Sequence, residues 1–105
     1  MKRLYTLILL ITLFFAACST SRKLTTTAQV QDGKSFATAV VITENHERQG
    51  IDAEYAWIKA QYPGYKSRGQ ALVYHDKKPF DIIHITTSDD LKMDLYFDIS
   101  NFFGK

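Results

Sequence analysis

The chain has 105 residues, with 13 Lys and Arg against 11 Asp and Glu, and a single cysteine. A chain of this length forms one small domain with a modest hydrophobic core. The near-balanced charge argues against nucleic acid as a partner, because the phosphate backbone attracts a basic stripe, and one cysteine cannot build a disulfide framework.

The N-terminal segment of the chain carries a secretory pattern. Lys2 and Arg3 come before a short apolar run, which ends at small residues followed by polar sequence. This order is typical of a signal peptide. The apolar run covers about a dozen residues, fewer than the roughly 20 that a membrane-spanning helix needs. A plain signal peptide cut after Ala17 stays open as an alternative, whereas the length of the run disfavours an uncleaved anchor.

The segment Phe15-Ala16-Ala17-Cys18 resembles the lipobox of bacterial lipoproteins, with Phe15 where Leu is usual. The resemblance implies that residues 1–17 are a lipoprotein signal peptide and that Cys18 becomes the lipidation site. Several acyl chains such as palmitate on one residue anchor a protein stably in a membrane. By the same resemblance, the absence of Asp beside Cys18 favours the bacterial outer membrane, with the protein facing the periplasm.

Residues 18–33 are rich in Ser, Thr and Gln and poor in bulky apolar side chains. Such a composition buries too little surface to offset the entropy of ordering. We therefore expect a flexible tether, followed by a small α+β domain over residues 34–105. Because Lys2 and Arg3 leave with the signal peptide, the mature chain is neutral. Attachment to the bilayer then depends on acylated Cys18 rather than on polybasic contact with lipid.

The first predicted element of the domain is a strand from Phe36 to Ile42, which is β-branched and apolar. A helix is predicted from Ile51 to Tyr62, because apolar residues recur there with the period of one helix face. Pro63-Gly64 ends this helix. The recurring apolar residues are Ile51, Tyr55, Ile58 and Tyr62.

Three strands complete the predicted domain, at 70–75 with an extension back to 66, at 80–87 and at 91–99. Turn-forming residues separate these strands at 76–79 and 88–90. The order β-α-β-β-β predicts an α+β fold in which a single helix packs on an antiparallel sheet.

The turns suggest a register in which His75 pairs with Phe80 and Thr86 pairs with Lys92. Asp81 then falls on the face turned to the core, where an unpaired carboxylate would be costly. Either Asp81 lies at the end of the sheet and bonds backbone groups, or the register is wrong there. The predicted core face carries Leu72, Tyr74, Ile83, Ile85, Met93, Leu95 and Phe97, which would meet Ile51, Tyr55 and Ile58 of the helix.

His84 falls opposite Asp94 in this register. A cross-strand pair of this kind orients the imidazole ring and raises its basicity, as a general base requires. No nucleophile is evident beside it, so a surface pair that fixes the register is the favoured interpretation. His75 lies roughly 13 Å along the sheet from His84 at the usual strand rise, too far for one zinc ion. We therefore predict no metal, no cofactor and no catalytic residue.

Aromatic residues are the remaining signal, because a core this small cannot hide them all. We predict an exposed contact patch formed by Phe80, Ile82 and Tyr96 together with Trp57, as a candidate binding site. For the tail, the favoured interpretation is that Phe102-Phe103 folds back and plugs the open end of the core. The alternative is that the tail joins the contact patch.

Three segments, at 62–65, 78–83 and 96–104, resemble parts of small uncharacterised lipoproteins from Bacteroidota-type bacteria, a resemblance that implies no known activity. We therefore predict a membrane-anchored envelope lipoprotein whose small, non-enzymatic domain binds a protein or peptide. The binding surface would be the outer sheet face or the edge of the first strand. The alternatives are a structural envelope component that self-associates and a small enzyme that uses His84 and Asp94.

Overall fold

The structure, a computed structural model, describes residues 30–105. The predicted signal peptide, Cys18 and most of the predicted tether lie outside the described residues. Among residues 30–105, no helix combines the length and the apolar character that crossing a membrane would require.

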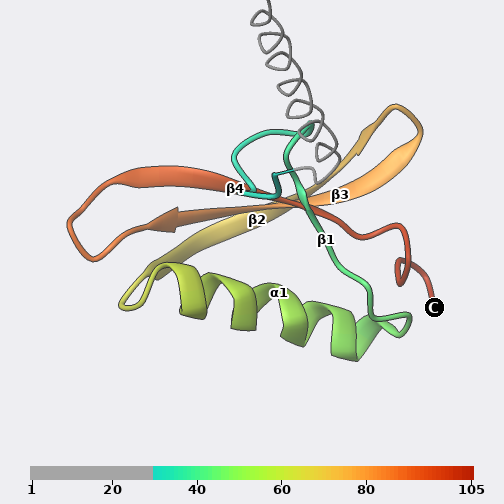
Figure 1. The fold of residues 1–105 in the computed structure, drawn as a ribbon, viewed down its shortest axis with the longest axis horizontal. Coiled ribbons are helices and arrows are strands. Elements are labelled where there is room, and N and C mark those ends of the chain that lie inside the picture. The colour runs from blue at the N-terminus through green and yellow to red at the C-terminus, as the bar shows by residue number, and fades with distance from the viewer. Residues whose placement is uncertain (1–29) are drawn as a thin grey trace, which may run out of the picture.

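The predicted α+β class and the order β-α-β-β-β are confirmed (Figure 1). Over residues 30–105, the strands form a four-stranded sheet in the order β1-β4-β3-β2. The last three strands make the expected antiparallel meander, whereas β1 runs parallel to β4, so the sheet is mixed. The elements are β1 (Val40–Val41), α1 (Glu47–Gln61), β2 (Lys66–His75), β3 (Lys78–Thr86) and β4 (Lys92–Asp98).

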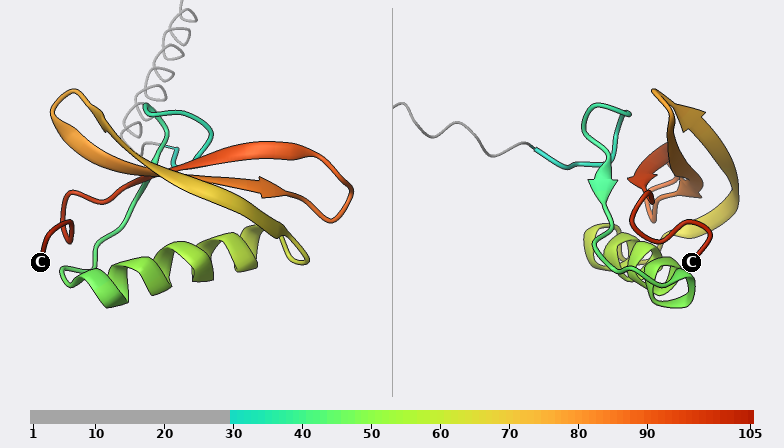
Figure 2. Two further views of the ribbon diagram at one scale, coloured as in Figure 1. Left: turned by 180° about the vertical axis from the view of Figure 1, so that it is seen from behind. Right: turned by 90° about the vertical axis from the view of Figure 1, so that its right-hand side faces the viewer.

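The helix α1 lies along one face of the sheet, called here the inner face (Figures 1 and 2). It begins at Glu47, four residues earlier than predicted. The C-terminal turn supports this extra helical turn, because the Glu47 N–H donates to the Lys105 carbonyl at 3.3 Å. The first N–H groups of a helix have no partner within the helix, so a carbonyl from elsewhere stabilises the start. His46, at the N-cap, makes no side-chain capping bond.

The first strand is much shorter than the predicted 36–42. Only Val40 and Val41 pair with β4, because residues 34–39 turn away from the sheet edge as a loop. The turn begins at Gly33, whose φ of +74° favours glycine. The Gly33 N–H donates to the Thr38 carbonyl at 2.8 Å, and the Gly33 carbonyl accepts from the Tyr96 N–H at 2.7 Å. Contacts of the domain therefore begin ahead of residue 34.

The register between β3 and β4 is confirmed, with Thr86 opposite Lys92. The register between β2 and β3 was predicted wrongly, because His75 pairs with Lys78 rather than with Phe80. The connecting loop has only two residues, Asp76 and Lys77, both at positive φ. This is the geometry of the tight hairpin turns that match strand twist. A shift by two residues keeps every side chain on its predicted face.

The core lies between the inner face and α1. Five predicted core residues are fully buried, and Tyr55 and Met93 pack against them half-buried. Three predictions are wrong, since Leu72, Tyr74 and Ile51 are 49%, 60% and 37% exposed. The buried sheet residues come from β3 and β4, so the helix covers these strands and leaves the edge strand β2 open. The five are Ile58, Ile83, Ile85, Leu95 and Phe97, and the predicted core face and helix stripe did not include Val40, Ile42 and Ile99.

The tail folds back as favoured, but only one of its phenylalanines enters the core. Phe102 is 2% exposed, and Phe103 stays 37% exposed with its ring 6.0 Å from that of Tyr74. Phe102 packs on the helix at Gly50, where an added Cβ would lie 2.1 Å from a Phe102 ring carbon. The glycine in the first turns of α1 therefore makes room for the tail.

Candidate functional site

The outer face of the sheet is covered by the loop at 34–39 instead of by a helix. Phe36 projects from this loop onto the sheet, where its ring stacks on His75 with centroids 4.0 Å apart and planes 6° apart. The same ring makes edge contacts with Phe80 at 5.0 Å and with Tyr96 at 4.8 Å. Such edge-to-face and stacked arrangements are the favoured geometries of aromatic pairs. One aromatic side chain thus pins the loop to the sheet.

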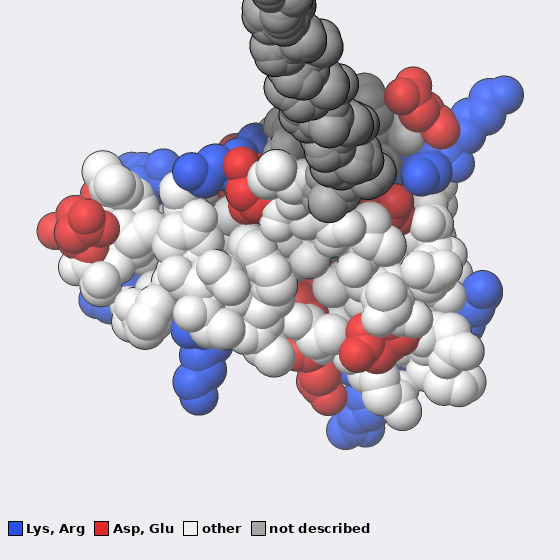
Figure 3. Space-filling model, viewed as in Figure 1, with Lys and Arg blue, Asp and Glu red and all other residues white. Residues whose placement is uncertain are grey.

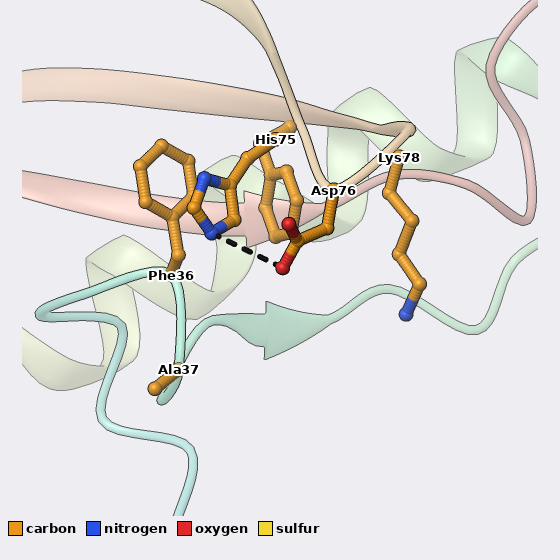
Figure 4. Close-up of a pocket in the computed structure, with 6 residues that line it drawn as sticks. Phe36, Ala37, His75, Asp76 and Lys78 are labelled. Carbon is orange, nitrogen blue, oxygen red and sulfur yellow. Dashed lines mark ion pairs between the residues drawn. The ribbon is translucent and has the colours of Figure 1, made fainter.

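Phe36 stands between two hollows that share a wall. The first, of about 280 Å³, is lined by Phe36, Ala37, His75, Asp76, Lys78 and Phe80 (Figure 4). The second, of about 300 Å³, is lined by Gln31, Phe36, Ala37, Ala39, Val41, Lys78, Phe80 and Asp98. Because the two have four lining residues in common, they form one groove, called here the outer groove. It runs from the β2–β3 turn to the edge of β1.

Each hollow lies at or just below the small end of ligand pockets, which span roughly 300–1,000 Å³. That size suits one or two amino-acid side chains better than a large cofactor. The outer groove can therefore hold alternate side chains of an extended chain, which point to the same side.

The groove contains one cation held by a carboxylate. The Lys78 ammonium lies 3.4 Å from Asp98 Oδ2, and Asp98 Oδ1 accepts from the Ser100 N–H at 3.0 Å and from its hydroxyl at 2.6 Å. Burial opposes ionisation of Asp98, but the bonds from Ser100 and the charge of Lys78 outweigh it and lower its pKa below the ordinary value. At the other end of the groove, His75 Nε2 lies 3.5 Å from Asp76 Oδ2, as the dashed line in Figure 4 marks.

The groove ends beside the free edge of β1. There the Val41 N–H donates to the side-chain carbonyl of Gln31 at 3.0 Å, and Val41 is 40% exposed. An amide oxygen thus occupies the place that the carbonyl of a further strand would take. Once Gln31 moves aside, the Val41 N–H can donate a hydrogen bond to a backbone carbonyl of a further strand.

The four residues predicted to form a contact patch do not lie together. Phe80 is buried beneath Phe36 at 5% exposure, and Ile82 and Tyr96 are half-buried on the same outer face. Trp57 is half-buried on the inner side, with its ring 5.6 Å from that of Phe97. Phe80 and Tyr96 therefore form the floor under Phe36, and Trp57 belongs to the helix–sheet core.

Three groove residues, Phe36, His75 and Lys78, were not among the predicted site residues. The signal for Phe36 was its position directly after Asp32-Gly33-Lys34-Ser35, a turn-forming run that starts a loop more readily than a strand. His75 and Lys78 flank the tight turn. Their position next to the loop depends on the register between β2 and β3, which was predicted two residues away from the observed one.

The cross-strand pair of His84 and Asp94 is confirmed. His84 Nδ1 lies 2.7 Å from Asp94 Oδ1, and the two side chains are 34% and 48% exposed. His84 is four residues along β3 from Phe80, which is about 13 Å at the usual strand rise. The pair is thus an open surface contact at a distance from the outer groove. Within the part of the chain that the structure describes, His, Cys, Asp and Glu form no group of three or more able to hold a metal ion.

Asp81 lies on the inner face opposite Phe97, as its predicted register required, and is only 7% exposed. Its neighbour is Glu54 of α1, which is fully buried and whose two carboxyl oxygens have no hydrogen-bond partner of regular geometry. Burial, then proton sharing with Asp81 and its charge, raise the pKa of Glu54 to about 10. Glu54 is therefore protonated at neutral pH. The buried Asp81 carboxyl thus faces a neutral carboxyl group of the helix instead of lying unpaired in the core.

Comparisons of the chain with protein-family models, with curated proteins and with solved structures find no match.

Proposed function

We propose that the protein is an envelope lipoprotein, anchored by acylated Cys18 in the outer membrane and facing the periplasm, whose domain binds an extended protein segment without catalysing a reaction. The lipobox-like sequence around Cys18 supports the anchor. The outer groove supports the binding role, because two adjoining side-chain-sized hollows lie on the outer face and the second of them reaches the edge of β1. This groove, which ends at a strand edge, is the observation that carries the proposal.

An extended segment fits the groove better than a compact ligand does. In strand addition, main-chain bonds to a free edge supply affinity and pockets for alternate side chains supply specificity. Here the Val41 N–H is the edge donor, and the hollows on either side of Phe36 are the pockets. Lys78 would then pair with a carboxylate of the segment or keep its contact with Asp98.

Site-specific photo-crosslinking tests the groove. A benzophenone amino acid replaces Val41, which lines the groove, in the full chain in its native membrane, and a second form carries it at the exposed Ala60 of α1. We expect a discrete cross-linked protein from position 41 that is absent from position 60 and weakened by Phe36→Ala. Equal products from both positions, or none from position 41, would contradict the proposal.

Mass spectrometry of the mature N-terminus tests the anchor separately. We expect a chain that starts at Cys18 and carries acyl mass, and we expect Cys18→Ser to leave the membrane fraction. An unmodified chain that starts at Cys18, or a Cys18→Ser form that stays with membranes, would remove the lipoprotein part of the proposal and leave the groove to be judged alone.

A further inference from the structure

The strand β2 leaves a second, longer edge open on the opposite side of the sheet from β1. It is the last strand in the order β1-β4-β3-β2 over the described residues, and it runs for ten residues from Lys66 to His75. The left panel of Figure 2 shows β2 crossing in front of the other strands. An edge strand presents backbone N–H and C=O groups that are ready to pair with a further chain.

The middle of this edge is apolar and uncovered. Leu72 and Tyr74 are 49% and 60% exposed. Phe103 packs edge-on against Tyr74, with the ring centroids 6.0 Å apart and the ring planes at 84° to each other. These three residues are called here the β2 strip. The strip is apolar surface that α1 does not reach, and it continues from the edge of the sheet onto the C-terminal turn.

Basic side chains outnumber acidic ones along this edge. Residues 66–78 contain four basic side chains, Lys66, Arg68, Lys77 and Lys78, against a single acidic one, Asp76. Asp76 lies beside His75 at 3.5 Å, and the Lys78 ammonium is held by Asp98 on the outer face. An incoming chain therefore meets Lys66 and Arg68 at the start of β2, and Lys77 beside Asp76 in the tight turn.

This charge pattern selects the partner. A second copy paired antiparallel would bring Lys66 and Arg68 of one β2 towards Lys77 of the other. A second copy paired parallel would bring the two basic starts of β2 together. Like charges across strands are destabilising.

We propose that the edge of β2 binds a short extended segment of another protein, with apolar alternate side chains at its centre and Asp or Glu at both ends. Its centre would cover Leu72 and Tyr74, and its acidic ends would meet Lys66 and Lys77. The sheet would gain a fifth strand. This surface is separate from the outer groove, so it adds a second contact to the proposed function and does not depend on it.

Fluorescence anisotropy with two labelled peptides tests the inference. The probes are Glu-Glu-Val-Thr-Val-Thr-Val-Glu-Glu and the same peptide with Lys in place of every Glu, each titrated with the full chain in detergent. We expect the acidic peptide to bind about tenfold more tightly than the basic one, and this ratio to shrink as salt rises to about 1 M. A version N-methylated at alternate backbone amides should bind much more weakly, because strand addition needs those N–H groups.

Two variants separate the edge from general effects on folding. Leu72→Asp should weaken the acidic peptide about tenfold, while Ala60→Asp on the exposed side of α1 should not change its binding. Reversing both flanking charges, Lys66→Glu with Lys77→Glu, should make the basic peptide the tighter binder, a result that loss of folding cannot produce. Phe36→Ala should leave both affinities unchanged, which separates this surface from the outer groove.

Three results would overturn the inference. The first is equal binding of the two peptides, or no binding of either at about 1 mM, well above the usual range for specific recognition. The second is full binding of the N-methylated peptide. The third is reversible dimerisation of the chain in sedimentation equilibrium that Leu72→Asp abolishes, because the occupant of the edge would then be a second copy.

Discussion

The two faces of the sheet are built from the same alternation of apolar residues but are covered in different ways. On the inner face, α1 seals Ile83, Ile85 and Leu95 completely and also encloses the carboxyl of Glu54. On the outer face, a loop lays one ring, Phe36, over the strands and leaves a groove on both sides of it. The covering segment, rather than the pattern of the strands, decides which face becomes core and which can bind.

This difference predicts a division of roles. A face sealed by a helix contributes to the free energy of unfolding of the whole domain, whereas a loop held by few contacts opens with a smaller free energy. Figure 3 shows that charges of both signs are interspersed around a largely uncharged surface in the view of Figure 1, without one dominant charged patch on that side. An approaching partner therefore meets no strong field of one sign on that side.

The largest effect is expected for Gly50→Ala on the inner side. In an exposed helix this change would favour folding by up to about 1 kcal/mol. Here the added Cβ would lie 2.1–2.5 Å from three ring atoms of Phe102, so the ring or the helix must shift. We expect a loss of about 3 kcal/mol in the free energy of unfolding, measured by urea denaturation.

Two further variants make this result specific. Gln49→Ala, at the exposed neighbouring position of the same helix turn, should change the free energy of unfolding by less than about 0.5 kcal/mol. Adding Phe102→Leu to Gly50→Ala should recover part of the loss, because the smaller side chain leaves space for the methyl group. A stabilised Gly50→Ala variant would mean that Phe102 does not occupy the first turns of α1.

A second effect on the inner side depends on pH. Glu54 has a pKa of about 10 in the folded state against an ordinary value of 4.5. Between these values the folded state keeps a proton that the unfolded state has released, so the free energy of unfolding falls as pH rises. Tyr55 next to it has a pKa raised by burial and by the Glu54 charge, so its own ionisation lies above this window. The decline should end once Glu54 is ionised in both states.

Replacing the carboxyl by an amide should remove this decline. Glu54→Gln cannot ionise, and its NH₂ group can donate to the Asp81 carboxylate. We expect it to exceed the wild type by about 2 kcal/mol at pH 9, and by much less at pH 5, in urea denaturation at each pH. Asp52→Asn, an exposed change on the same helix, is the matched control and should leave the pH profile unchanged. A wild-type profile that is flat from pH 5 to 9 would contradict a proton held at Glu54.

The sequence predicted local pattern well and tertiary coverage poorly. Alternation placed Ile83, Leu95 and Phe97 on the core face correctly, but the same alternation also placed Leu72 and Tyr74 there. A period-two pattern defines a face and not the segment that covers it. The edge position of β2, which no local signal reveals, decided the exposure of those two residues.

Two features, the register between β2 and β3 and the buried Glu54, were not predicted although the sequence carries a weak signal for each. A lysine rarely adopts positive φ, so a two-residue loop at Asp76-Lys77 was less expected than a longer turn, and the register slipped by two. Glu54 lies between Ile51 and Ile58 on the apolar stripe of the helix, which marked it as a carboxylate facing the core. The groove itself depends on contacts of Phe36 with strand residues 39 to 60 positions further along the chain, which only the folded chain shows.

A smaller effect is expected on the outer face for Phe36→Ala. The change removes one stacked and two edge contacts between aromatic rings, so we expect a loss of about 1–2 kcal/mol in the free energy of unfolding. The amides of residues 34–39 should lose protection from hydrogen exchange while those of β3 keep it. Phe103→Ala removes an exposed ring that has a single aromatic partner among residues 30–105. It is the control and should cost less. Equal loss of protection in β3 would mean that the loop and the core unfold together.

The smallest effect is expected for the pair of His84 and Asp94. Both side chains are open to solvent, and exposed ion pairs contribute about 0–1 kcal/mol because water and salt screen them. A double-mutant cycle with His84→Ala, Asp94→Ala and both together should therefore give a coupling free energy below about 1 kcal/mol, reduced further in about 1 M salt. Cross-linking from position 41 should be unaffected by either change, because the pair lies away from the outer groove. A coupling above about 2 kcal/mol, or loss of the cross-link in His84→Ala, would show that this pair does more than fix the pairing of β3 with β4.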